Sequence, residues 1–334
     1  MDNNITPDIE ERFRQPKGWR WHHFERIKGR KIRFGSVFPQ DSIPDAVIIC
    51  LQGVREFSEK YFETAHWCLD HNFAFWTLDW AGQGESTRYI PANPQKRFNG
   101  DFREDVADLH YFINEYIKHS SVHPDKGRIP LAMLAHSMGA HIGLRLLHDH
   151  PKIVECAAMS APMIGLKVFE HIPNPVASVA STFCSTLMGN NYIPGGKDWV
   201  NTLPSPEKKL TSDPVRSLIH NQWCELNESL RCGDVTYGWV HQAHKSCMSL
   251  QNSNYHKRIE TPCIFGIPEH EHLVDNKTSL KTVNNMKNTE ILEYPESYHE
   301  ILMEKDEIRN DFLQKFYNLI DKMTIKRPET LKPF

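Results

Sequence analysis

Short uncharged runs alternate with longer amphipathic stretches along most of the chain. The runs are rich in β-branched and aromatic residues, which is typical of strands whose two faces are both covered. In the longer stretches apolar residues recur at helical spacing, and Asp101 suits the start of one such helix. The alternation predicts parallel β-α-β units and therefore an α/β fold. The first of these elements are strands at Ala46–Leu51 and Phe73–Leu78 and helices at Ser58–His71 and Asp101–Lys118.

The same pattern continues toward both ends of the chain. Two runs that alternate in character flank Lys28-Gly29-Arg30, which predicts an antiparallel hairpin at a sheet edge, over residues 19–26 and 31–38. Further strands are expected at Leu131–Leu134, Cys156–Ser160, Pro262–Gly266 and Glu290–Tyr294, and further helices at Ala140–His148 and Ile301–Ile320.

The alternation breaks between about Met163 and Gln251, a segment rich in Pro, Ser, Asn and Gly. It still contains amphipathic pieces, at 176–187 and 214–226. A segment of this length inserted in a compact sheet is usually a lid or a binding subdomain. We therefore expect two core parts, residues 1–162 and 252–334, with an inserted cap at 163–251.

The charge balance and the hydropathy exclude two classes of protein. The 334 residues include 39 basic and 42 acidic side chains, a formal charge of -3, without a dense basic stripe. We therefore expect no nucleic-acid partner. No apolar run approaches about 18 residues, so no transmembrane helix is expected. The acidic, polar start, Met-Asp-Asn-Asn-Ile-Thr, is not typical of a secretory signal peptide, which favours a cytoplasmic protein.

Eight cysteines and 19 histidines raise the question of a disulfide framework or a metal site. The cysteines are scattered singly, and we interpret most of them as small core residues in a reducing compartment. The histidines have no His-Glu-x-x-His or comparable spacing. The sequence therefore implies no metal and no organic cofactor.

The sharpest chemical signal is Ala135-His136-Ser137-Met138-Gly139, which joins an apolar run to a helical stretch. In a nucleophile elbow, a serine lies on a strained turn between a strand and a helix, and small residues two positions before and after it allow close backbone approach. The bare pattern is common by chance, so its position at this junction carries the weight. The alternative is a serine that merely starts a helix after a core strand.

A serine nucleophile needs a base, and the base needs an orienting acid. In this arrangement the chain order is Ser, acid, His, with the last two on loops after late strands. His299 follows the strand expected at 290–294 and precedes the last helix, which is the position of the base. Three carboxylates compete for the role of the acid in the loop after the preceding strand: Glu269, Glu271 and Asp275.

Two backbone N–H groups are needed to bind the oxyanion of an acyl-transfer intermediate. One is that of Met138, directly after the serine. The other is expected from the loop after the strand at 46–51, where Gly53 permits a sharp turn and Val54 is the donor. The Gly-x-Gly segment within residues 78–86 lacks the third glycine of a dinucleotide site, so we expect it to shape a tight loop near the active site.

Together these motifs resemble the α/β-hydrolase superfamily, most closely its bacterial lysophospholipase and monoacylglycerol-lipase branch. Residues 52–61 resemble the branch's His-Gly-x-Gly-Glu-x-Ser-x-x-Tyr loop. The resemblance implies a mostly parallel central sheet flanked by helices, with an inserted, mainly helical cap. Further matching segments follow in the right order at 78–86, 136–139, 160–163, 210–214, 236–239 and 299–304.

The resemblance also implies roles for single residues. The branch pattern Asp-Arg-hydrophobic-Val-Asp, laid on residues 271–275, implies Glu271 as the orienting acid and Asp275 as a structural carboxylate. Supporting roles are implied for Gly53, Glu56, Asp79 and Gly139. The chain departs from the branch at four positions, where it has Gln52 for His, Arg55 for Gly, Ala135 for Gly and Glu271 for Asp.

The expected chemistry is attack of Ser137 on an ester carbonyl, with His299 as base and Glu271 as its orienting acid. The resemblance favours small lipid esters, either lysophospholipids or monoacylglycerols. The apolar stretch 176–188 then lines an acyl cavity, contacts a membrane surface transiently, or packs on the core. Three alternatives remain: a short-chain esterase, a prolyl-type aminopeptidase, and a catalytically silent binding protein of the same fold.

Overall fold

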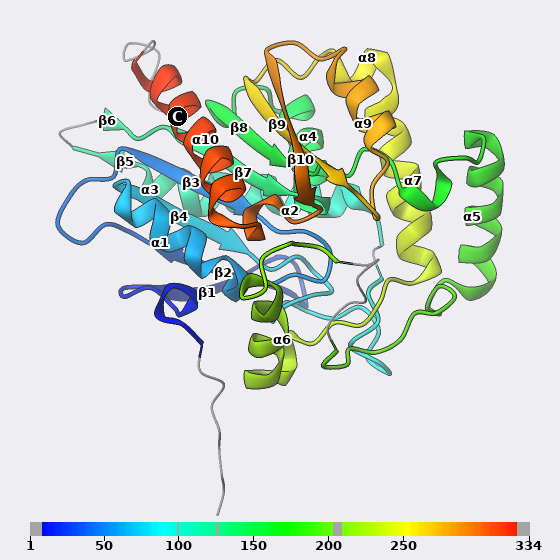
Figure 1. Cartoon of the computed structure of the whole chain (residues 1–334). Coiled ribbons are helices and arrows are strands. Elements are labelled where there is room, and N and C mark those ends of the chain that lie inside the picture. The colour runs from blue at the N-terminus through cyan, green and yellow to red at the C-terminus, as the bar shows by residue number, and fades with distance from the viewer. Residues whose placement is uncertain (1–8, 99, 125–126, 203–208, 326–334) are drawn as a thin grey trace, which may run out of the picture.

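The computed structural model describes residues 9–98, 100–124, 127–202 and 209–325 (Figure 1). The amino-terminal residues on which the signal-peptide expectation rests lie outside this part. An eight-stranded sheet has the order β1-β2-β4-β3-β7-β8-β9-β10, in which β1 and β2 form the expected antiparallel hairpin. β2 is also antiparallel to β4, and the remaining neighbours are parallel. The strands are β1 (Arg20–Ile27), β2 (Arg30–Val37), β3 (Ala46–Leu51), β4 (Phe73–Leu78), β7 (Leu131–His136), β8 (Cys156–Ser160), β9 (Cys263–His270) and β10 (Thr289–Tyr298).

Helices cover both faces of the sheet, and the central strands β3, β4, β7 and β8 are therefore buried along their whole length. In β3 the alternate residues Val47 and Ile49 contact one layer of helices, whereas Ile48 and Cys50 contact the other. The first layer contains α2 (Phe102–Phe112), α4 (Met138–Asp149) and α9 (Asn276–Val283), and the second contains α1 (Phe62–Asp70) and α10 (Asp306–Ile325). A π-helical turn at Ile113–Ile117 and the short α3 (Lys118–Ser120) continue α2, and a separate small hairpin pairs β5 (Val122–His123) with β6 (Gly127–Arg128). The mostly parallel sheet flanked by helices is confirmed.

The segment inserted between β8 and β9 is mainly helical, with α5 (Asn174–Met188), α6 (Arg216–Leu226), α7 (Tyr237–Gln251) and α8 (Ser253–His256). α7 lies beside the core helices, and its Trp239 and Cys247 are buried in the same cluster as α2 and α4. α5 lies on the outer side of α7, and α6 lies apart from both (Figure 1). There the Trp223 ring packs edge-on against Phe62 of α1, with ring centroids 5.5 Å apart.

The structure extends several of the predicted elements and adds others, among them α7 and α9. β7 continues to His136, directly before the serine, and β9 continues to His270. α7 and α9 were not among the predicted helices. α7 lies in the segment rich in Pro, Ser, Asn and Gly, and α9 is only eight residues long, with Leu280 and Val283 as its apolar residues. All eight cysteines are free thiols and seven of them are buried, which confirms the interpretation as core residues. Within the described ranges, no helix is long and apolar enough to cross a membrane.

Candidate active site

Ser137 lies on a sharp turn between β7 and α4. Its backbone has φ 51° and ψ -114°, and residues other than glycine rarely have a positive φ. A Cβ atom on Gly139 would lie 2.4 Å from the carbonyl oxygen of Leu51 and 2.6 Å from that of Gln52. Glycine at this position therefore lets the first turn of α4 press against the end of β3. Ala135, the other small residue of the motif, is buried within β7, where its methyl group is accommodated.

The three predicted site residues meet at the carboxyl ends of their strands. His299 Nε2 lies 3.0 Å from Ser137 Oγ, and His299 Nδ1 lies 2.6 Å from Glu271 Oε2. Glu271 follows β9 and His299 follows β10, and these parallel neighbours bring the two loops together. All three side chains are nearly buried. The arrangement is that of a nucleophile, a base and an orienting acid.

The other two carboxylates of the loop do not reach the imidazole. Glu269 is exposed on β9. Asp275 caps α9, where Oδ1 accepts the Thr278 N–H at 3.1 Å and Oδ2 the Thr278 hydroxyl at 2.5 Å. Of the three alternatives that the residues alone left open, the structure brings only Glu271 to His299.

Glu271 divides its two oxygens between the ring and the backbone. Oε2 faces His299, while Oε1 accepts the N–H groups of Leu273 at 2.7 Å and Val274 at 3.2 Å. Burial alone raises the pKa of Glu271, but the His299 ring and these amides outweigh it and hold that pKa below its usual range. Burial alone lowers the pKa of His299, but the facing Glu271 carboxylate outweighs the effect of burial, and the pKa of His299 is raised above its usual value. The Glu271 carboxylate therefore stabilises the protonated form of the His299 ring.

A second histidine, His136, packs against the His299 ring but forms no hydrogen bond with Ser137 or Glu271 among the described residues. The His136 ring meets the His299 ring edge-on, with centroids 4.8 Å apart. Burial lowers the pKa of His136 to about 3, despite the raising effect of nearby Glu56, so this ring is neutral. A neutral His136 adds no positive charge that would oppose protonation of His299.

One of the two predicted oxyanion donors, the Val54 N–H, lies in the loop after β3. The Gly53 N–H donates to Glu56 Oε2 at 2.5 Å, and the Arg55 N–H donates to Gln83 Oε1 at 3.1 Å. Between them, the Val54 N–H makes no hydrogen bond to any described residue. The Met138 N–H is the first in α4, where no carbonyl precedes it within the helix. Both predicted oxyanion donors are therefore available.

Gln83 also holds this loop, and the sequence did not single it out. Its buried Nε2 donates to the carbonyl oxygens of Gly53 at 2.8 Å and Glu56 at 2.7 Å. Asp79 holds the next turn by accepting the Ser58 N–H at 2.9 Å and hydroxyl at 2.8 Å. The predicted tight loop at 78–86 therefore supports the Val54 peptide. Its position directly after β4, the strand beside β3, was the only sequence signal for this role.

Arg55 shows how one departure from the branch pattern is accommodated. Its φ of 68° is a conformation that suits the glycine common at this position. The side chain forms an ion pair with Asp234 of the inserted segment, with 2.6 Å between Nη1 and Oδ1. The loop thus keeps its shape and also gains a contact to the insertion.

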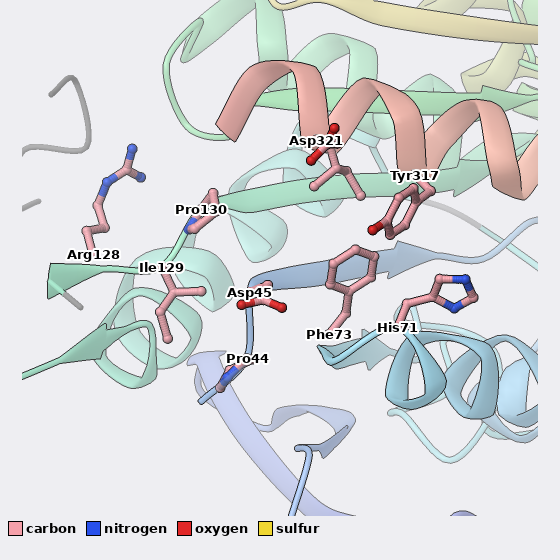
Figure 2. Close-up of a pocket in the computed structure, with 10 residues that line it drawn as sticks. Pro44, Asp45, His71, Phe73, Arg128, Ile129, Pro130, Tyr317 and Asp321 are labelled. Atoms are coloured by element: carbon pink, nitrogen blue, oxygen red, sulfur yellow. The ribbon is translucent and has the colours of Figure 1, made fainter. Parts of the chain in front are cut away.

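A hollow elsewhere in the molecule contains none of the predicted site residues. This pocket of about 380 Å³ lies at the amino ends of β3, β4 and β7, at the opposite end of the strands from Ser137. Figure 2 shows Phe73 and Tyr317 on one wall and Asp45 and Ile129 on the other. Among the described residues, no group of three or more His, Cys, Asp or Glu side chains could hold a metal ion.

The fold and the elbow define an α/β hydrolase with a buried Ser-His-Glu arrangement. Comparison with known proteins gives its family. A family model described as "Serine aminopeptidase, S33" (Hydrolase_4) matches residues 42–306, so the chain belongs to this family, and its place in the α/β-hydrolase superfamily is confirmed.

Individual relatives carry lipase names. The chain is 27% identical to lysophospholipase L2 of Escherichia coli (strain K12) over 278 residues, 80% of this chain and 77% of that protein. It is 24% identical to the probable lysophospholipase L2 of Haemophilus influenzae over 294 residues, 87% and 88% of the two chains. A soluble variant of monoglyceride lipase from Saccharomyces cerevisiae, solved with a substrate analog, has the same fold, with a TM-score of 0.70 at 18% identity over 92% of this chain and 96% of that one.

Replacing Gln83 by alanine should destabilise the protein. The change removes three buried hydrogen bonds and leaves two carbonyls without a donor, so the free energy of unfolding should fall by about 2–4 kcal/mol. Urea denaturation measures this change. Gln314→Ala is the control, because Gln314 is exposed on α10 and its side chain bonds to Asn318 one turn further along the same helix. Equal effects of the two substitutions would contradict the role of Gln83.

Proposed function

We propose that the protein is a serine hydrolase that cleaves carboxylic esters through an acyl-enzyme. The observation that carries the proposal is the chain of hydrogen bonds from Ser137 through His299 to Glu271. The names of the relatives support single-chain lipid esters, lysophospholipids or monoacylglycerols, as substrates. In this proposal residues 163–251 act as a cap on a core formed by 1–162 and 252–334, in a cytoplasmic protein peripheral to the membrane.

In the first half-reaction Ser137 Oγ attacks the carbonyl carbon while His299 Nε2 takes the hydroxyl proton. Glu271 stabilises the imidazolium, and the N–H groups of Val54 and Met138 donate to the oxyanion. Collapse of the tetrahedral intermediate breaks the ester bond, and His299 gives its proton to the departing alcohol. Water then attacks the acyl-enzyme with His299 again as base, and the fatty acid leaves Ser137 free.

Ser137→Ala and His299→Ala should abolish labelling by a fluorophosphonate probe and lower kcat by about three orders of magnitude or more, with folding intact. Glu271→Gln should label slowly, because the amide cannot stabilise the imidazolium. Labelling is read on a gel, and circular dichroism checks the fold.

Ser246→Ala is the matched control for this experiment. Ser246 Oγ also lies against a buried histidine, 2.5 Å from His141 Nε2, but it stands inside α7 without an elbow. We expect this variant to label like the wild type. A wild-type protein that does not label at all would favour the silent binding protein.

The acyl chain of the substrate is tested with p-nitrophenyl esters of rising length. Each methylene buried by the protein contributes about 0.8 kcal/mol, so burial of about two of the eight methylenes that decanoate adds to acetate is enough to raise kcat/KM roughly tenfold. The free fatty acid released from lysophosphatidylcholine and from monoacylglycerol then separates the two head groups. A sharp optimum at the shortest acyl chain would favour the short-chain esterase, and hydrolysis of an amino-terminal prolyl amide instead of esters would favour the aminopeptidase.

We also propose that α5 contacts the membrane surface that holds the substrate. The helix has no charged residue over 174–188. Its apolar side chains recur every three or four residues, which places them along one side of the helix. These exposed side chains, between 57% and 72% accessible, are Val176, Val179, Phe183 and Leu187.

Phe183→Asp with Leu187→Asp should weaken binding to phosphatidylglycerol–phosphatidylethanolamine vesicles by about tenfold or more, because the apolar area lost is that of two large side chains. Co-sedimentation measures binding. The control is Val122→Asp, which changes a side chain that is 53% exposed outside the cap. Unchanged binding of the α5 variant would refute the contact while leaving the ester hydrolase untouched.

A further inference from the structure

Lys60 is a buried cation that the mechanism does not use. It lies on the one-turn 3-10 helix Ser58–Tyr61, directly after the loop of Val54, and is 3% exposed. Its Nζ lies 2.7 Å from Glu56 Oε1 and 2.7 Å from Glu300 Oε1. Both carboxylates are themselves buried. A lysine is almost never buried in this way unless it is paired.

The first of the two carboxylates belongs to the oxyanion loop. Glu56 Oε2 accepts the Gly53 N–H at 2.5 Å and the Tyr61 hydroxyl at 2.7 Å, which leaves Oε1 for Lys60. The side chain of Glu56 therefore fixes the turn in which the Val54 N–H is exposed. A Cβ atom on Gly53 would lie 2.9 Å from Glu56 Oε2, so this turn has little freedom.

The second carboxylate belongs to the loop of the proposed base. Glu300 follows His299 directly, and its N–H donates to the carbonyl oxygen of Leu210 at 2.8 Å. Lys60 holds its side chain. The backbone that carries the His299 ring is therefore anchored on both the main chain and the side chain of the next residue.

We propose that Lys60 is a positioning residue, whose ammonium joins the oxyanion loop to the base loop through Glu56 and Glu300. The inference rests on the proposed function. In it, one ion triad keeps the Val54 N–H and the His299 ring in fixed positions about Ser137. Lys60 itself does not touch the reacting atoms.

The triad also sets the charge around the imidazole. Among the described residues, the carboxylates that act on His299 are Glu271, Glu300 and Glu56, and the Lys60 ammonium lies between the last two. The neutral His136 ring and the Ser137 hydroxyl also contact the imidazole. Burial lowers the pKa of His299, and the three carboxylates raise it. Removing the charge of Glu300 therefore lowers the pKa of His299, whereas removing that of Lys60 leaves more negative charge unbalanced and raises it.

The test measures kcat, KM and the pH profile of p-nitrophenyl ester hydrolysis for Lys60→Met, Lys60→Arg and Glu300→Gln. Since the base must be neutral, the acid limb of kcat/KM follows the pKa of His299. We expect Lys60→Met to lower kcat by about tenfold to a hundredfold with little change in KM. Its acid limb should move to higher pH, and that of Glu300→Gln to lower pH. Lys60→Arg keeps the charge and should restore most of kcat.

Lys287→Met is the matched control, because Lys287 pairs with Glu260 on the surface at 3.4 Å. If Lys60→Met does not fold, Glu300→Gln, which keeps the size of the side chain, decides the question. Wild-type kcat and an unmoved acid limb in folded Lys60 and Glu300 variants would overturn the inference, as would a Lys60→Arg enzyme as impaired as Lys60→Met. Those results need an active wild type. An inactive, unlabelled wild type instead refutes the proposed function itself.

Discussion

The close approach of α4 to the end of β3 is the contact on which the site depends. It is possible only because Gly139 has no side chain to meet the carbonyl oxygens of Leu51 and Gln52. This approach places the Met138 N–H, at the start of α4, beside the loop that continues from β3 with Gly53 and Val54. One packing contact thereby brings together both predicted oxyanion donors and the strained serine between them. The strain at Ser137 is tolerable because buried elements on both sides of the turn hold it.

The parallel sheet supplies the rest of the arrangement. The carboxyl ends of parallel strands lie at the same end of the sheet. The loops after β3, β7, β9 and β10 therefore lie close together as a consequence of the strand arrangement alone. Glutamate replaces aspartate within this frame because one oxygen of Glu271 is bound by the Leu273 and Val274 amides. That anchoring removes the freedom of the extra methylene and leaves the other oxygen for His299. The substitution therefore preserves the orientation of the ring.

The local sequence pattern was enough to predict elements whose position depends on one property, such as burial on both faces. The uncharged runs at β3, β4 and β8 predicted the observed bounds, because a strand buried on both faces excludes charged side chains at every position. The same method missed α7, whose buried face includes the polar residues His244 and Ser246. It also left Glu269, Glu271 and Asp275 as equals, since loop conformation decides which carboxylate reaches His299. The roles of Gln83 and Lys60 could not be predicted from the local pattern, because their hydrogen-bond partners depend on long-range packing. Glu300, for example, is 240 positions from Lys60.

The inserted segment also holds the loop that carries the proposed base, His299. The Leu210 carbonyl accepts the N–H of Glu300, and the Thr211 hydroxyl donates to the carbonyl of Met303 at 2.6 Å. Both contacts come from the irregular segment that leads into α6. The buried Arg216 of α6 pairs with Glu63 of α1 at 2.7 Å. The base loop is therefore clamped between an element of the core and an element of the insertion. The position of the His299 ring is therefore tied to the packing of α6 against α1.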